Sequence, residues 1–209
     1  MGRVRVSALV MAGLASAALA GTAQATTVTQ ADLTQGLSSV SLDGFTITTT
    51  GNTGTGFFDH KTGDGVTGVG VGGNGAVVGG EIDNHEKITV TSTSGQHLLT
   101  SFEVSFLYPN GFQGDTVNEI ALLALTGPSS SLTLTATGAH SDTLSVLGTV
   151  TNESAANNTG AGEWLVTLTT PLLFTNLVFE PGDGGTSGIS PPRTYECPIA
   201  ISAPIISSR

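Results

Sequence analysis

The sequence predicts an all-β protein, an antiparallel β-sandwich of jelly-roll-like type, on three observations. Apolar and polar residues alternate along several short segments, so that one face of each segment would meet a core and the other water. The composition favours strands and turns, because the 209 residues include 32 Thr and 29 Gly while only 11% are charged. Turn-forming pairs such as Ser94-Gly95 and Gly127-Pro128 separate the segments at a spacing typical of sandwiches.

Seven segments show the alternation clearly. Each carries apolar side chains at every second position, and they lie at 45–48, 88–91, 102–106, 132–136, 144–146, 164–168 and 177–179. The run 120–125, IALLAL, is apolar throughout and predicts a strand buried on both faces, with a short helix as the alternative.

Two stretches lack this pattern. Residues 51–80 have a very high density of Gly and predict a long surface loop with a short edge strand at 66–71. Residues 191–209 lose the alternation, so we expect an irregular C-terminal tail outside the compact fold. No linker divides the chain before that point, and the sequence predicts a single β-sandwich domain over residues 26–190.

The first 25 residues have the features of a secretory signal peptide. Arg3 and Arg5 precede an apolar run at 7–20, and Ala23-Gln24-Ala25 forms a small-x-small cleavage site. The run is short for a bilayer span, which disfavours the alternative of a membrane anchor. We therefore expect a secreted protein, extracellular or at the cell surface, whose mature form begins at Thr26 and does not lie in a membrane.

The charge balance limits the possible partners. Lys+Arg is 6 and Asp+Glu is 16, for a net charge of -10. Such a chain cannot neutralise a row of phosphates, which excludes nucleic acid as a partner, but it attracts divalent cations. Cys197 is the only cysteine, so no disulfide forms within the chain. Stability must come from the core, with a bound metal ion as a second source.

Two acidic segments just before predicted strands are candidates for a Ca²⁺ site. Calcium takes about six to eight oxygen ligands from carboxylates, amides and carbonyls on loops. Four candidate ligands lie in segment 81–86 and two in segment 115–119: Glu81, Asp83, Asn84, Glu86, Asp115 and Glu119. The alternative is that they are solvated turn residues, since no fixed ligand spacing such as that of an EF-hand is present.

Patterns that indicate catalysis are scarce. The four histidines form no HExxH motif, and no G-x-S-x-G motif is present. Glu103 and Glu163 are both expected to point away from the core, and two carboxyl groups facing each other across a sugar are sufficient for a glycosidase. However, only 5% of the residues are aromatic, and Trp164 is expected in the core, which disfavours a sugar-binding cleft.

The segments GVTGVGV at 65–71 and GEIDNHE at 80–86 precede a predicted strand near 101–107. Together they resemble a run found in the exported bacterial β-sandwich proteins that carry PEP-CTERM sorting tails, and the resemblance extends over residues 45–179. It implies export to the cell surface or extracellular matrix and supplies no catalytic residues. The chain ends without Pro-Glu-Pro, an apolar span or an Arg cluster, so we expect release as a soluble protein rather than sorting by that route.

The sequence therefore predicts a secreted, non-catalytic protein of the extracellular matrix or cell surface, adhesive or structural in role, with Ca²⁺ as the candidate stabilising ion. Its expected partners are extracellular polysaccharide or another surface protein. Two alternatives remain open. Exposed aromatic side chains on one sheet face would favour a carbohydrate-binding module or a jelly-roll glycosidase. Long rows of Thr on an exposed sheet would favour a self-assembling surface or filament subunit.

Overall fold

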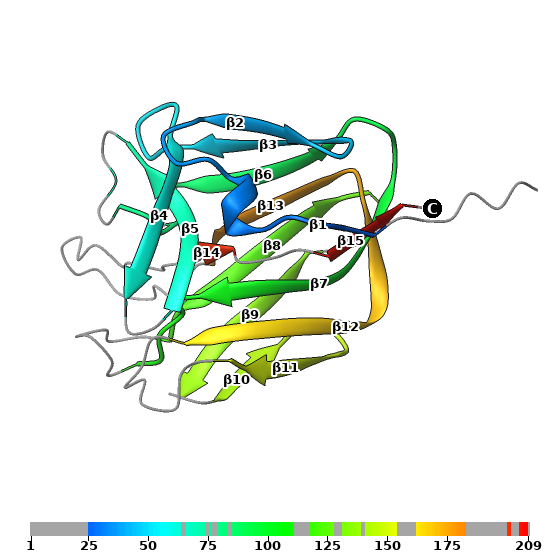
Figure 1. Cartoon of the computed structure of the whole chain (residues 1–209). Helices are drawn as coiled ribbons and strands as arrows, with labels where there is room; N and C mark the ends of the chain where they lie inside the picture. Colours follow the sequence, from blue (N-terminus) through cyan, green and yellow to red (C-terminus); the bar gives the residue numbers. More distant parts are fainter. Residues whose placement is uncertain are drawn as a thin grey trace, which may run out of the picture.

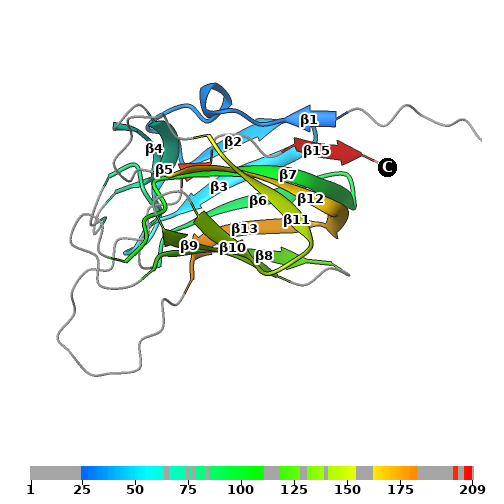
Figure 2. The ribbon, with the colours of Figure 1, turned by 90° about the horizontal axis from the view of Figure 1, so that it is seen from below.

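The computed structural model describes residues 25–63, 66–73, 76, 79–82, 85–110, 118–127, 131–138, 141–153, 162–182, 200–201 and 205–208. In these ranges the chain forms strands joined by turns, with one short 3₁₀ helix, η1 (Gln30–Asp32). None of the described helical structure is long and apolar enough to cross a membrane. Two antiparallel sheets lie face to face (Figures 1 and 2), which confirms the predicted all-β sandwich.

The larger sheet has seven strands in the order β10-β9-β8-β13-β6-β3-β2. All of its pairings are antiparallel. It contains the predicted strands at 45–48, 88–91, 132–136 and 177–179. The bounds are β2 Ser39–Leu42, β3 Phe45–Thr50, β6 Lys87–Ser92, β8 Ile120–Thr126, β9 Leu132–Gly138, β10 Ser141–Leu144 and β13 Asn176–Pro181.

The smaller sheet has six strands in the order β1-β15-β7-β12-β11, with β14 also paired to β7. The predicted strands at 102–106 and 164–168 lie here. Two short strands, β14 and β15, come from the stretch 191–209 and pair with β7. The bounds are β1 Ala25–Thr27, β7 His97–Ser105, β11 Gly148–Asn152, β12 Glu163–Phe174, β14 Ala200–Ile201 and β15 Ile205–Ser208.

The chain crosses repeatedly between the two sheets, at β6–β7, β7–β8, β10–β11 and β12–β13. These crossings place strands that are distant in sequence next to each other. For example, β13 lies between β8 and β6, about 50 to 90 residues earlier in the chain. This return of late strands between early ones is the jelly-roll-like feature of the sandwich.

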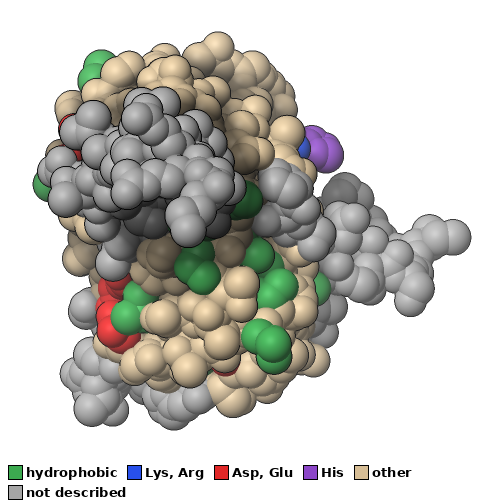
Figure 3. Space-filling model, turned by 90° about the vertical axis from the view of Figure 1, so that its right-hand side faces the viewer, with side chains coloured by type: hydrophobic (Ala, Val, Ile, Leu, Met, Phe, Trp, Pro, Cys, Tyr) green, Lys and Arg blue, Asp and Glu red, His purple; other side chains and the backbone are tan. Residues whose placement is uncertain are grey.

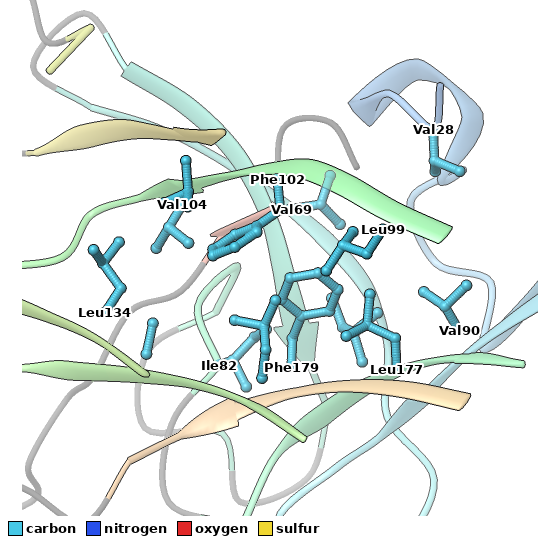
Figure 4. Close-up of a cluster of buried hydrophobic side chains, with 14 of the residues drawn as sticks. Val28, Val69, Ile82, Val90, Leu99, Phe102, Val104, Leu134, Leu177 and Phe179 are labelled. Atoms are coloured by element: carbon cyan, nitrogen blue, oxygen red, sulfur yellow. The ribbon is translucent and has the colours of Figure 1, made fainter. Parts of the chain in front are cut away.

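The hydrophobic core fills the space between the sheets, as the alternation predicts. On β12, Trp164, Val166 and Leu168 are buried while the residues between them face outward. Figure 4 shows Phe102 of β7 pointing toward Phe179 of β13 in the opposite sheet. Their rings meet edge-on with centroids 6.4 Å apart, a favourable aromatic geometry.

The expectation of a long surface loop over the Gly-rich stretch is wrong. Two strands from this stretch, β4 (Phe57–Gly63) and β5 (Val66–Gly72), form a two-stranded antiparallel sheet, which includes the predicted edge strand at 66–71. Phe58, Val69 and Val71 belong to the core. Glycine permits this burial, because a Cβ atom at Gly70 would lie 2.3 Å from the backbone nitrogen of Glu81.

Two smaller predictions also need correction. The run 120–125 is a strand, but it is buried on one face only, because Ala121 and Leu123 are buried while the residues beside them are half-buried. The predicted strand at 144–146 is displaced toward the N-terminus. β10 ends at Leu144, and residues 145–147 form the bend that leads into β11, because the change of sheet interrupts the alternation there.

Candidate carboxylate sites

Half of the predicted calcium ligands can be placed. Asp83, Asn84 and Asp115 lie outside the described residues. Glu81, Glu86 and Glu119 are described, and their exposed fractions are 1%, 0% and 5%. These three side chains are therefore not solvated turn residues. A buried carboxylate is stable only when a cation, a hydrogen-bond donor or a proton compensates for the lost water.

Lys61 provides this compensation for Glu81. The Lys61 Nζ forms an ion pair with Glu81 Oε1, and the exposed fractions of the two side chains are 28% and 2%. Backbone pairing fixes Glu81, since the Val71 N–H donates to the Glu81 carbonyl oxygen at 2.7 Å. The Lys61 Nζ also lies 4.9 Å from the ring centroid of Phe106. Sequence analysis missed this pair because Lys61 falls in the stretch interpreted as a loop.

Glu119 is held by the chain that follows β7. Its Oε2 accepts a hydrogen bond from the Tyr108 N–H at 2.5 Å, and its own N–H donates to the Tyr108 carbonyl oxygen at 3.0 Å. Within the described ranges, no three His, Cys, Asp or Glu side chains come together in a way that could hold a metal ion. With half of the predicted set outside those ranges, the calcium site stays a prediction.

A second group of carboxyl side chains lies on the smaller sheet. Leu165 of β12 is opposite Glu103 of β7, and Glu163 is opposite Ser105, so Glu103 and Glu163 are diagonal neighbours on the outer face. Both side chains are half-buried at this position. Glu153 follows β11, and its N–H donates to the Glu163 carbonyl oxygen at 2.7 Å. The alternation predicted the outward direction of the first two residues, but nothing in the sequence indicated Glu153.

Burial, the hydrogen bond to Glu103 and the negative charges of Glu103 and Glu153 raise the pKa of Glu163 to about 7. Two carboxyl groups form a hydrogen bond to each other only when one of them holds a proton. The glycosidase alternative stays a prediction.

Asp142 is an acidic residue that points inward from an edge strand. It lies on β10, the last strand of the larger sheet, and its Oδ2 is buried without a hydrogen bond to any described group. Burial raises the pKa of Asp142 to about 6. An inward-pointing charge on an edge strand opposes pairing with another strand, because a newly added strand would bury it further.

The outer face of the larger sheet carries rows of hydroxyl groups. One row crosses β2, β3 and β6 through Ser39, Thr48 and Thr89, and a second through Ser41, Thr46 and Thr91. No described strand lies on that side of the sheet (Figure 2). The charged groups on this face, within the described strands, are the Lys87–Glu180 ion pair, which has no net charge. Charged side chains are also sparse on the part of the surface drawn in Figure 3.

Within the described part of the chain, aromatic side chains do not line the outer face of either large sheet. In the described strands of both sheets every Phe and Trp is buried, and the exposed aromatic residue of the described chain is Phe57 of β4, at 37%. The carbohydrate-binding alternative is therefore not supported by an aromatic platform on these strands.

Comparison of the chain with protein-family models, with curated proteins and with solved structures gave no match. The function must therefore be inferred from the surfaces and side-chain clusters of the chain itself.

Proposed function

We propose that this is a secreted, non-catalytic protein that acts by contact at the cell surface or in the extracellular matrix, in an adhesive or structural role. The observation that supports this proposal is the outer face of the larger sheet, with its rows of Ser and Thr and its balanced charge. A hydroxyl group both donates and accepts hydrogen bonds, so such rows suit a neutral polar partner such as an extracellular polysaccharide or another surface protein. Within the described strands of that face, the Lys87–Glu180 pair is the charged group that would have to lose its water.

A paired substitution tests this face. Thr48 and Thr89 are opposite each other in the register, and changing both to Lys places two charges at the centre of the hydroxyl rows. Thr149 and Thr167 are opposite each other on the outer face of the smaller sheet and provide a matched control pair. We expect Thr48→Lys/Thr89→Lys to abolish binding to isolated matrix and to a panel of neutral polysaccharides, and Thr149→Lys/Thr167→Lys to retain it. Equal binding by both variants would exclude this face as the contact surface.

Calcium enters the proposal as a stabilising ion. The three buried carboxyl groups of Glu81, Glu86 and Glu119 support it, since each lies in or beside a segment with further acidic residues. Added Ca²⁺ should then raise the melting temperature in a concentration-dependent way, and Glu86→Gln should weaken the effect. Identical melting curves in excess Ca²⁺ and in chelator would refute the ion while leaving the contact function untouched.

Self-assembly is a second candidate, favoured by the same rows of Thr on an unpartnered sheet face. Seven strands about 4.8 Å apart and about 20 Å long give a face of roughly 600–700 Å², so that two copies would bury about 1,200–1,400 Å² in total. That value is at the lower end for specific interfaces. Light scattering across a range of concentrations should then show a dimer that Thr48→Lys/Thr89→Lys dissociates. A monomer at every concentration, for the unsubstituted chain, would rule this candidate out.

A further inference from the structure

We propose that the free edge of β2 pairs with β2 of a second copy of this chain, in antiparallel orientation, so that Ser39 of each copy lies opposite Ser41 of the other. The two larger sheets would then form one continuous sheet. The pairing rests on the geometry of the edge alone, and it is separate from the face-to-face assembly considered above.

The backbone of β2 faces β3 at every second residue. A two-residue turn, Asp43-Gly44, joins the two strands, and its φ angles of 45° and 85° are those of a type I′ hairpin. Such a turn closes on a hydrogen-bonded pair, here Leu42 with Phe45, and hydrogen-bonded pairs alternate along antiparallel strands. The intervening positions of β2 therefore direct their backbone groups away from β3.

Ser39 and Ser41 hold these outward positions. The Thr49 N–H donates to the Ser38 carbonyl oxygen at 3.1 Å, which agrees with the alternation because position 38 faces β3. Both serines are exposed, and within the described chain their backbone groups have no hydrogen-bond partner. Figure 1 shows no described strand beyond β2, the last strand of the larger sheet. Its edge thus offers two donors and two acceptors to another strand.

The opposite edge of the same sheet is protected against such pairing. β10 has four residues, as β2 has, but its register shifts between Ser141 and Asp142, and Asp142 Oδ2 is buried. A register irregularity and an inward-pointing acidic side chain both keep edge strands from pairing with other chains. β2 contains no charged residue and no proline, and its register with β3 is unbroken. The two edges therefore differ, and β2 is the open one.

The spacing of the outward positions fits a second copy of the same strand. With a twofold axis at Val40, Ser39 of each copy lies opposite Ser41 of the other, and each of these two pairs exchanges two backbone hydrogen bonds. Val40 would lie opposite its own counterpart, so this half-buried apolar side chain would lose further contact with water. A contact of this symmetry closes on itself, which predicts a dimer rather than a filament.

The charge nearest to β2 in the chain does not oppose the pairing. Asp43 follows β2 and lies three residues from Val40. At about 3.3 Å per residue on each side of the axis, the two Asp43 residues of the dimer would be about 20 Å apart. This separation is more than twice the Debye length of about 8 Å at physiological ionic strength, so their repulsion is largely screened.

The pairing would join the hydroxyl rows of the two copies. The row that begins at Ser39 in one copy would continue into the row that begins at Ser41 in the other. A polysaccharide or surface protein would then meet two linked faces at once, which raises its apparent affinity. This consequence rests on the proposed contact function, whereas the pairing itself does not.

Paired substitutions on β2 test the register by sedimentation equilibrium of the full chain. Ser39→Lys/Ser41→Lys places like charges opposite each other twice across the axis and should raise the dissociation constant of the dimer about tenfold. Ser39→Lys/Ser41→Glu places opposite charges there and should dimerise at least as well as the unsubstituted chain. Thr149→Lys/Thr167→Lys adds two positive charges to the smaller sheet and is the matched control, which should dimerise normally.

Two further measurements locate the contact at the edge. An equimolar mixture of Ser39→Lys/Ser41→Lys with Ser39→Glu/Ser41→Glu should form a heterodimer, although neither variant dimerises well alone. In the unsubstituted chain, amide exchange at Ser39 and Ser41 should slow as the protein concentration rises. Exchange at Val40 and Leu42 should not, because their N–H groups already face β3 in the monomer.

The outcomes separate this pairing from the other proposals. Thr48→Lys/Thr89→Lys should leave the edge dimer intact, because these residues lie on β3 and β6. The pairing is overturned if the unsubstituted chain stays monomeric up to about 1 mM, or if Ser39→Lys/Ser41→Glu dissociates as readily as Ser39→Lys/Ser41→Lys. A dimer that depends on β2 but binds no polysaccharide or matrix would support the pairing and refute the contact function alone.

Discussion

Replacing Lys61 by Met should show how strongly the fold depends on one ion pair. The Glu81 carboxylate is 2% exposed, and the Lys61 ammonium is its cationic partner. Removing one partner of a buried pair costs about 3–5 kcal/mol, because the other charge stays buried. The Lys61 side chain is 28% exposed, so water can partly replace the ammonium. We therefore expect the free energy of unfolding to fall by about 2–3 kcal/mol, including the lost contact with the Phe106 ring.

Urea unfolding followed by the fluorescence of Trp164 measures this change, since that side chain is 2% exposed in the folded state. Lys87→Met is the matched control. Its ion pair with Glu180 is open to solvent, with exposed fractions of 43% and 19%, so the loss should be at most about 1 kcal/mol. The double variant Lys61→Met/Glu81→Leu removes both charges and should recover most of the stability. Equal losses for Lys61→Met and Lys87→Met would show that the Glu81 site is not desolvated and would refute the reasoning.

Three other substitutions test individual sites by urea unfolding. Asp142→Asn should raise the free energy of unfolding by about 1–2 kcal/mol at pH 7.5, because burial raises the pKa of this carboxyl to about 6. The gain should shrink toward pH 4, where the carboxyl group is protonated in the folded chain. An equal gain at both pH values would show that the ionisation of Asp142 is not its cause. Burial lowers the pKa of His97, so the free energy of unfolding of the unsubstituted chain should fall as the pH drops below about 6.5. In His97→Gln this fall should be smaller. Parallel curves of unfolding free energy against pH for the two chains would show that His97 is not its cause. Gly70→Ala should lower the free energy of unfolding by more than about 2 kcal/mol, since its Cβ would meet the Glu81 backbone. At Gly63 a Cβ would lie 3.5 Å from a ring carbon of Phe106, so Gly63→Ala should lower it by less than about 1 kcal/mol. Similar losses in the two variants would refute the close approach at Gly70.

The strands predicted most accurately are those whose side chains report burial. Phe102 and Val104 of β7, like Trp164 and Val166 of β12, are apolar residues at alternate positions, and each is buried. The β4–β5 sheet was missed because its buried positions include residues that have no apolar side chain. Gly68, Gly70 and Gly72 are buried but have no side chain, so their burial leaves no trace in a hydrophobic pattern. Close approach of backbones is a tertiary property that a local period does not encode.

The candidate sites show the same division between local and tertiary information. Alternation predicted that Glu103 and Glu163 would share an outer face. It did not predict that they would be diagonal neighbours, because the register between two strands 60 residues apart depends on the whole sheet. The partnership of Lys61 with Glu81 likewise depends on how β4, β5 and residue 81 come together. Segment composition identified which residues are acidic, and the fold determines which of them are buried.

The charge balance of the described chain sets the pH at which the fold should be most stable. Its two lysines pair with Glu81 and Glu180, and burial raises the pKa values of Glu163 and Asp142, so these two half-buried carboxyl groups bind protons more strongly in the folded chain than in the unfolded chain. Both contributions are lost as the pH rises through about 6 to 7, whereas His97 lowers the stability as the pH falls below about 6.5. Between about pH 4.5 and 6 the two carboxyl groups together hold two more protons in the folded than in the unfolded state, whereas His97 holds at most one fewer, so stability falls with rising pH in this window. The maximum of the melting temperature in calcium-free buffer should therefore lie at about pH 4–4.5, which a scan from pH 3 to pH 9 measures. Combining Asp142→Asn with Glu163→Gln should shift the maximum toward higher pH, because only the acid-side loss then remains. A maximum at pH 8 in the unsubstituted chain would mean that cations, rather than protons, neutralise these carboxyl groups.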